Sequence, residues 1–189
     1  MVSALPPTFK RLVDGDVLTI GGRQFAVLTG NGHAPEQVML YCAADNIFLA
    51  ADQVLAKITP NISVWAVDPD GDPLGLYMRS LGELKARIPA DALVLPGHQL
   101  PFYGLHTRSD ELIAHHRLRC DAVADACRKE PRSAAELVPV LFSRELDPHQ
   151  MSFAFSEVQA HVNYMVAKGQ LNWLEGNDGV ERVAINPVI

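Results

Sequence analysis

The chain has 189 residues, of which 48% are hydrophobic and 20% charged, with a formal net charge of −6 and a pI of about 5.6. This composition is typical of a soluble globular protein. An acidic chain lacks the basic surface that phosphate recognition needs, and no apolar run reaches the roughly 18 residues of a membrane span. We therefore expect a protein that does not cross a membrane and for which nucleic acid is an unlikely partner.

The cysteines indicate a reducing compartment. There are three of them, an odd number without Cys-x-x-Cys spacing, which predicts neither a disulfide framework nor a zinc knuckle. Cys120 and Cys127 lie seven residues apart in a helical pattern and are interpreted as small core residues. The first seven residues hold no basic region followed by an apolar run, so no signal peptide is predicted. We expect a cytoplasmic protein.

The first part of the chain is rich in predicted strands. Short runs of β-forming residues are separated by Gly, Asn and Asp, and Gly21-Gly22 and Asp45-Asn46 predict tight turns. A loop rich in Pro and Asp follows Asp52, and Asp72-Pro73 then begins an amphipathic helix that extends to Ile88. The predicted strands are residues 17–20, 23–29, 37–42, 47–50 and 92–95.

The second part is mainly helical. Apolar spacing predicts a long helix over 109–128, a short one over 133–142 opened by the capping box Ser133–Glu136, and a third over 152–168 that ends at Gly169. Residues 171–174 and 180–185 predict a hairpin. The inward stripes would be Leu112, His116, Cys120, Val123 and Cys127 on the long helix, and Phe155, Val158, Val162, Met165 and Val166 on the third. We predict an α/β domain over 1–128 and a small winged-helix-like α+β module over 129–189.

Three polar side chains stand directly after predicted strands. His33 lies in a glycine-rich turn, Asp52 follows a second strand, and His98 follows Leu95-Pro96-Gly97. Imidazole and carboxylate are ligands that zinc, iron and manganese accept, and strand ends hold them rigidly. Singly, each has a simpler interpretation, because a histidine in a turn is usually solvated and an aspartate after a strand usually caps a helix. Their shared context favours a metal site.

These segments resemble the metallo-β-lactamase superfamily, in its glyoxalase II-like and β-lactamase-like hydrolase branch. The resemblance is carried by Gly32-His33-Ala-Pro-Glu-Gln, Ala51-Asp52-Gln-Val-Leu with Ile58-Thr-Pro-Asn-Ile-Ser63, and Leu95-Pro-Gly-His98. It implies the second half of an αββα sandwich and a binuclear zinc (or iron or manganese) site. His33 would bind the first metal, His98 the second, and Asp52 would bridge both in a catalytic role. The implied activity is hydrolysis of an ester, thioester or lactone.

The family's His-x-His-x-Asp-His motif is absent from this sequence, and no histidine precedes His33. Each metal would keep one histidine and the bridging carboxylate, fewer than the three protein ligands of a usual catalytic zinc. We therefore predict that one copy of the chain does not assemble a complete site, and that the chain is truncated or inactive by itself. The inner sheet face would lie open, to be covered by a missing N-terminal half or by a second copy in a homodimer.

Two other functions stay open. The chain could be a non-catalytic remnant that acts in homodimerisation or interaction. It could also process nucleic acid, but residues 129–189 carry five Lys/Arg against eight Asp/Glu, which disfavours this alternative. Among the other aromatic residues, His116 is predicted to be a hydrogen-bonded core residue, and His106, His149 and His161 to face solvent or cap locally. Trp65 would pack or line a substrate cleft.

Overall fold

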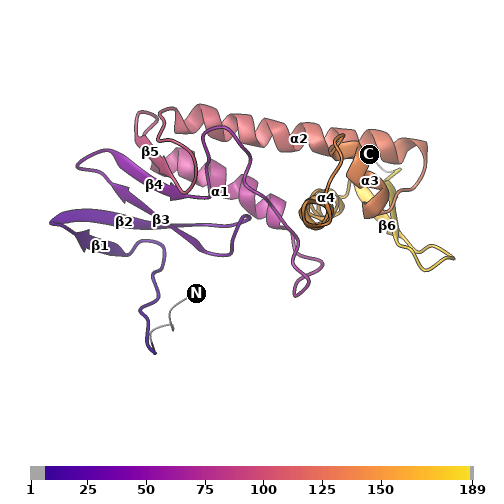
Figure 1. Cartoon of the computed structure of the whole chain (residues 1–189), viewed down its shortest axis with the longest axis horizontal. Helices are drawn as coiled ribbons and strands as arrows, with labels where there is room; N and C mark the ends of the chain where they lie inside the picture. Colours follow the sequence, from indigo (N-terminus) through magenta and orange to yellow (C-terminus); the bar gives the residue numbers. More distant parts are fainter. Residues whose placement is uncertain (1–6, 188–189) are drawn as a thin grey trace.

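Five strands form one mixed sheet, and the helices over Pro73–Arg87 and Leu105–Lys129 lie on the same side of it (Figure 1). The computed structural model describes residues 7–187. The prediction that the first seven residues hold no signal peptide therefore falls almost entirely outside the described residues. The strands follow one another in the sheet in chain order, antiparallel except for the parallel pair β4–β5. They are β1 (Val17–Ile20), β2 (Arg23–Gly30), β3 (Gln37–Cys42), β4 (Ile47–Ala51) and β5 (Leu93–Pro96).

One sheet face carries the core. Leu28 pairs with Met39, and Phe48 pairs with Val94, so the alternation of strand side chains places all four on the face beneath the helices. All four are buried in a single apolar cluster that includes residues of every helix. The turn between β1 and β2 holds both of its glycines at positive φ, as the Gly21-Gly22 pair predicted.

The opposite sheet face is also apolar. Val27, Leu40, Leu49 and Leu95 are successive partners across β2, β3, β4 and β5 and form one row on that face. Val27 is buried, while the other three are partly exposed. Within residues 7–187, no helix or strand packs over this row, as Figure 1 shows below the sheet.

Four helices complete the described chain, and two of them begin earlier than expected. They are α1 (Pro73–Arg87), α2 (Leu105–Lys129), α3 (Ala134–Leu141) and α4 (Pro148–Ala167). The prediction for α2 began at residue 109, but the helix starts directly after Gly104, whose φ is 95°. The prediction for α4 began at 152, but the helix starts four residues earlier at Pro148, where Asp147 and Gln150 form a capping box.

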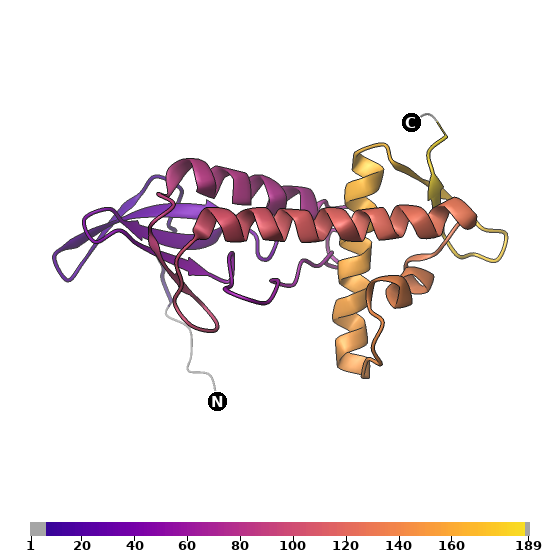
Figure 2. The ribbon, with the colours of Figure 1, turned by 90° about the horizontal axis from the view of Figure 1, so that it is seen from above.

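Helix α2 connects the two parts of the molecule. In Figure 2 it runs beside α1 over the sheet and then crosses α4. The hairpin of β6 (Leu171–Leu174) and β7 (Arg182–Ile185) packs against its far end and against α4. The winged-helix arrangement and the boundary after residue 128 stay predictions. None of the described helices is long and apolar enough to cross a bilayer.

Candidate metal centre

The sheet brings His33, Asp52 and His98 to one edge. Strand β2 runs antiparallel to β3, and β3 antiparallel to β4, so β2, β4 and β5 all point the same way. Their carboxyl ends therefore meet at the same edge. Asp52 follows β4 directly, and His98 and His33 lie two and three residues beyond β5 and β2.

The two imidazoles face one carboxylate oxygen. Nε2 of His98 lies 3.4 Å from Oδ2 of Asp52, and Nε2 of His33 lies 3.7 Å from the same atom. The two Nε2 atoms lie more than 4.8 Å apart. Among residues 7–187, a group with all its ligand atoms within 4.8 Å of one another does exist, but it does not include these three residues. Two nitrogens on one tetrahedral zinc would be about 3.3 Å apart. One tetrahedral ion therefore does not reach both histidines in this arrangement.

His33 is held in the tautomer that a ligand needs. Its Nδ1 lies 2.8 Å from the carbonyl oxygen of Asn61, which can only accept, so Nδ1 carries the proton. Nε2 is the ring nitrogen that faces Asp52. A metal-binding histidine usually donates its other N–H to a carbonyl or carboxylate in this way.

The backbone comes very close to Asp52. A Cβ at Gly97 would lie 2.3 Å from Oδ1 of Asp52, so glycine lets the chain pass this close to the carboxylate. The N–H of Gly97 donates to the carbonyl of Ala51 at 2.7 Å, and Ala51 itself adopts a left-handed φ of 46°. A non-glycine residue in this region carries backbone strain, which is common at functional sites.

Two further side chains position the loops that bear the candidate ligands. Gln53 is fully buried, and its Nε2 donates to the carbonyl of Asn31 at 3.1 Å, which ties the Asp52 loop to the His33 loop. Arg108 on α2 donates through Nε to the carbonyl of Leu55 and through Nη2 to that of Ile58. Neither role was predicted from the sequence, because the partners are 22 to 53 residues away and no local pattern marks them.

The donor types fit a divalent metal, but the number of donors does not complete a site. Oδ1 of Asp52 is buried without a hydrogen-bond partner among the described residues, an arrangement that a nearby cation would satisfy. His33, Asp52 and His98 offer the nitrogen and oxygen ligands that zinc, iron or manganese accept. With Asp52 as a bridge, each ion would have two ligands from these residues, one fewer than the three of a usual catalytic zinc.

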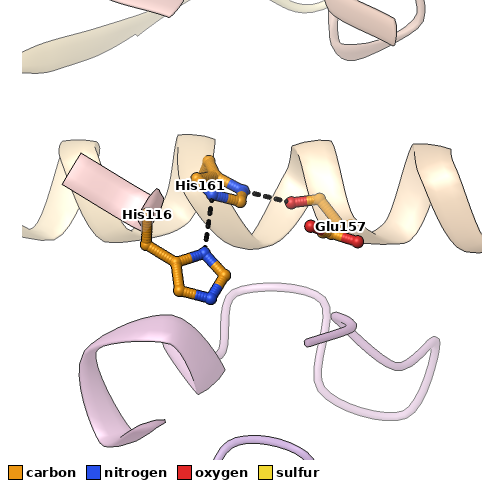
Figure 3. Close-up of side chains that lie close together, drawn as sticks. All are labelled: His116, Glu157 and His161. Atoms are coloured by element: carbon orange, nitrogen blue, oxygen red, sulfur yellow. Dashed lines mark hydrogen bonds between the residues drawn. The ribbon is translucent and has the colours of Figure 1, made fainter. Parts of the chain in front are cut away.

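A second polar cluster is buried between α2 and α4, where His116, His161 and Glu157 meet (Figure 3). Within residues 7–187, it is the one group whose three ligand atoms lie within 4.8 Å of one another. Nδ1 of His161 lies 2.7 Å from the Glu157 carbonyl and must donate to it, so Nε2 of His161 accepts from Nδ1 of His116 at 3.1 Å. The prediction of a hydrogen-bonded core residue is confirmed for His116. The prediction of solvent or local capping for His161 is wrong, because its side chain is fully buried against α2.

This cluster is better explained as a neutral hydrogen-bonded network than as a metal centre. Burial lowers the pKa of His116 to about 2 and that of His161 to about 4, so both rings are uncharged at neutral pH. A metal there would displace the Nδ1 proton of His116 and would lie beside a cation, since Nη1 of Arg119 is 3.3 Å from Oε1 of Glu157. We therefore interpret the cluster as a structural joint between α2 and α4.

Comparisons with known proteins agree with this architecture. Residues 120–185 match the family model of the metallo-β-lactamase-like C-terminal domain. A β-lactamase domain protein from Burkholderia ambifaria is 45% identical with a TM-score of 0.93, and the match covers 96% of this chain and 54% of that one. A metallo-β-lactamase family protein from Thermus thermophilus is 32% identical with a TM-score of 0.81, over 95% and 55% of the two chains. The chain thus spans about half the length of these solved relatives.

Proposed function

We propose a function from one premise, that this chain belongs to the metallo-β-lactamase superfamily and corresponds to a C-terminal part of that fold. It is the C-terminal portion of a metal-dependent hydrolase that acts on an ester, thioester or lactone. The observation that carries the proposal is the placement of two imidazoles on Oδ2 of Asp52, 3.4 and 3.7 Å away.

The three side chains would have separate roles. His33 would bind one ion through Nε2, since its other nitrogen is engaged by Asn61. His98, whose side chain is 67% exposed, would bind a second ion at the open side of the site. Asp52 would bridge the ions and neutralise part of their charge. Divalent metals held by these residues would lower the pKa of a bound water toward neutrality and would polarise the scissile carbonyl.

The remaining ligands would come from outside the residues described. We propose that the apolar row of Val27, Leu40, Leu49 and Leu95 packs against another polypeptide surface that also completes the site. That surface is either an N-terminal half of a longer protein or a second copy of this chain. A row of this kind left in water would favour association.

Metal analysis tests the proposal. The chain would be mixed with the N-terminal part of a relative, which supplies the remaining ligands, and dialysed against cobalt or zinc. Its metal content would be compared with that of Asp52→Asn, His33→Ala and His98→Ala in the same mixture. We expect Asp52→Asn to remove both ions and each histidine variant to weaken one, while His149→Ala, an exposed histidine on α4, changes nothing. Metal content that is the same in the wild type and in Asp52→Asn would refute the proposed site.

A second candidate is a non-catalytic interaction module, favoured by the small number of ligands and by the open apolar row. Light scattering at micromolar concentration separates the cases. A dimer that binds no metal would support the module, while a monomer that gains mass and metal on mixing with the N-terminal part of a relative would support the hydrolase.

A further inference from the structure

The loop between β4 and α1 connects the candidate metal centre to α4. It begins at Asp52, passes Asn61 beside His33, and reaches α4, where the N–H of Val64 donates to the carbonyl of Ser156 at 3.3 Å. Nδ2 of Asn163 on α4 donates to the carbonyls of Pro69 and Gly71 at 2.8 and 2.9 Å. Figure 2 shows this loop extending from the sheet toward α4. The C-terminal helix therefore holds one wall of the surface beside the site.

Trp65 is the central residue of that surface. It is 59% exposed, and it lines two adjoining pockets, which also share Val64. The first, of about 110 Å³, lies against Gly32 and Pro35 on either side of His33. The second, of about 280 Å³, lies against Phe155 on α4. We call the two pockets together the Trp65 groove.

Phe155 departs from the expected pattern in a way that fits this groove. The helical spacing placed it on the inward stripe of α4, but its side chain is 43% exposed. That prediction is wrong, because the other helices and the β6–β7 hairpin pack on α4 and bury Val158 and Val162, whereas Phe155 faces the loop. An exposed phenylalanine next to an exposed tryptophan is an apolar surface of the kind that marks a binding site.

The lining also defines the charge of the occupant. Asp68 and Asp72 are the charged side chains that line the Trp65 groove within the described residues, and no lysine or arginine contributes. An anionic group such as a phosphate or a free carboxylate would meet repulsion there. Both pockets are also smaller than the 300–1,000 Å³ of sites that enclose a drug-sized ligand, so a slender chain fits better than a bulky ring system.

We propose that the Trp65 groove binds the uncharged aliphatic arm of the substrate, with Phe155 selecting for chain length. This inference deepens the proposed function, because it names the substrate class as esters, thioesters or lactones with a neutral acyl chain. The arm lies along Trp65 from the His33 loop toward α4, and its far end contacts Phe155. The C-terminal helix thereby takes part in substrate recognition as well as in stability.

Calorimetric titration of the whole chain with simple amides tests the groove without requiring activity or metal. Each buried methylene contributes up to about fourfold in affinity, so we expect octanamide to bind at least tenfold more tightly than butanamide. Octanoate, which adds a negative charge to the same chain, should bind more weakly than octanamide. In Trp173→Phe, which leaves Trp65 as the remaining indole, octanamide should shift the fluorescence emission to the blue.

The variants have a matched control on the same helix. Phe155→Ala should weaken octanamide at least fivefold and leave butanamide unchanged, because only the longer chain reaches α4. Phe153→Ala should have no effect, since Phe153 has similar exposure but lines a different surface. Equal binding of the two amides, or equal effects of the two phenylalanine variants, would overturn the proposal. Asp52→Asn should leave octanamide binding intact, so a failed metal site and a failed groove give different results.

Discussion

The buried pair His116–His161 should make this protein sensitive to mild acid. Both rings are neutral in the folded state, with pKa values lowered by burial to about 2 and about 4, against 6.5 in the unfolded chain. Because the unfolded chain binds more protons below pH 6.5, the free energy of unfolding falls as the pH drops. The stability from this pair is fully present above pH 6.5 and is lost progressively below it.

The size of the effect follows from the fraction of protonated imidazole. At pH 5 an unfolded histidine with a pKa of 6.5 is almost fully charged, whereas both buried rings stay neutral. Each then costs about 2 kcal/mol relative to pH 8, or about 4 kcal/mol for the pair. This value depends little on the folded pKa values as long as they stay below about 4.5. It is a large part of the 5–15 kcal/mol that stabilises a typical domain.

Two neighbouring groups modify the pH profile. Burial lowers the pKa of His115, which adds to the loss of stability in acid. Burial raises the pKa of Glu157, and a carboxyl group with a raised folded pKa favours the folded state at low pH, so it offsets part of the loss. Arg119, which pairs with Glu157, stays charged throughout and opposes protonation of both buried histidines.

Denaturant unfolding followed by circular dichroism at pH 5, 6, 7 and 8 measures this dependence. We expect the wild type to lose about 4 kcal/mol between pH 8 and pH 5 through the pair, with most of the change below pH 6.5. The double variant His116→Gln/His161→Gln should be less stable at pH 8 but should show a much flatter profile. The exposed His149→Gln serves as the control. Two results would refute the reasoning. One is a wild-type profile that is flat from pH 7 to 5, and the other is a profile of the double variant that is as steep as that of the wild type.

Two further predictions concern backbone geometry and the loop beside the site. Gly97→Ala should lower the metal content in the dialysis assay, because its Cβ would displace Oδ1 of Asp52. In the control Gly82→Ala no atom lies near the added Cβ, so this variant should stabilise α1 by about 1 kcal/mol. Equal metal content in the two alanine variants would contradict the first expectation. Asn163→Ala removes both hydrogen bonds that this side chain donates to the loop, so the free energy of unfolding should fall by about 1–3 kcal/mol and amide exchange near Gly71 should accelerate. Unchanged exchange there would show that the loop does not depend on α4.

The sequence by itself determined which elements form, and it determined the ends of the five sheet strands to within one residue. Alternating apolar residues bounded by turn residues predicted the five strands, and ligands that stand directly after strands must lie at a sheet edge. Their residue types, their places after strands and the resemblance of the flanking segments together named His33, Asp52 and His98 as candidates, and their role as metal ligands stays a prediction. The inward stripe of α2 was also predicted, because a helical period reports which face is apolar, and Leu112, His116 and Val123 are all buried as expected.

Only the tertiary structure decided which partners those faces meet. His161 and His116 are 45 residues apart, and His33 and Asn61 are 28 apart, so no local pattern joins either pair. Phe155 has the spacing of a core residue, but the elements packed on α4 leave it at the surface. Periodicity specifies the orientation of a side chain relative to its own helix or strand. Burial, hydrogen-bond partners and pKa values depend on the neighbouring elements, and these are set by the packing of segments distant in the sequence.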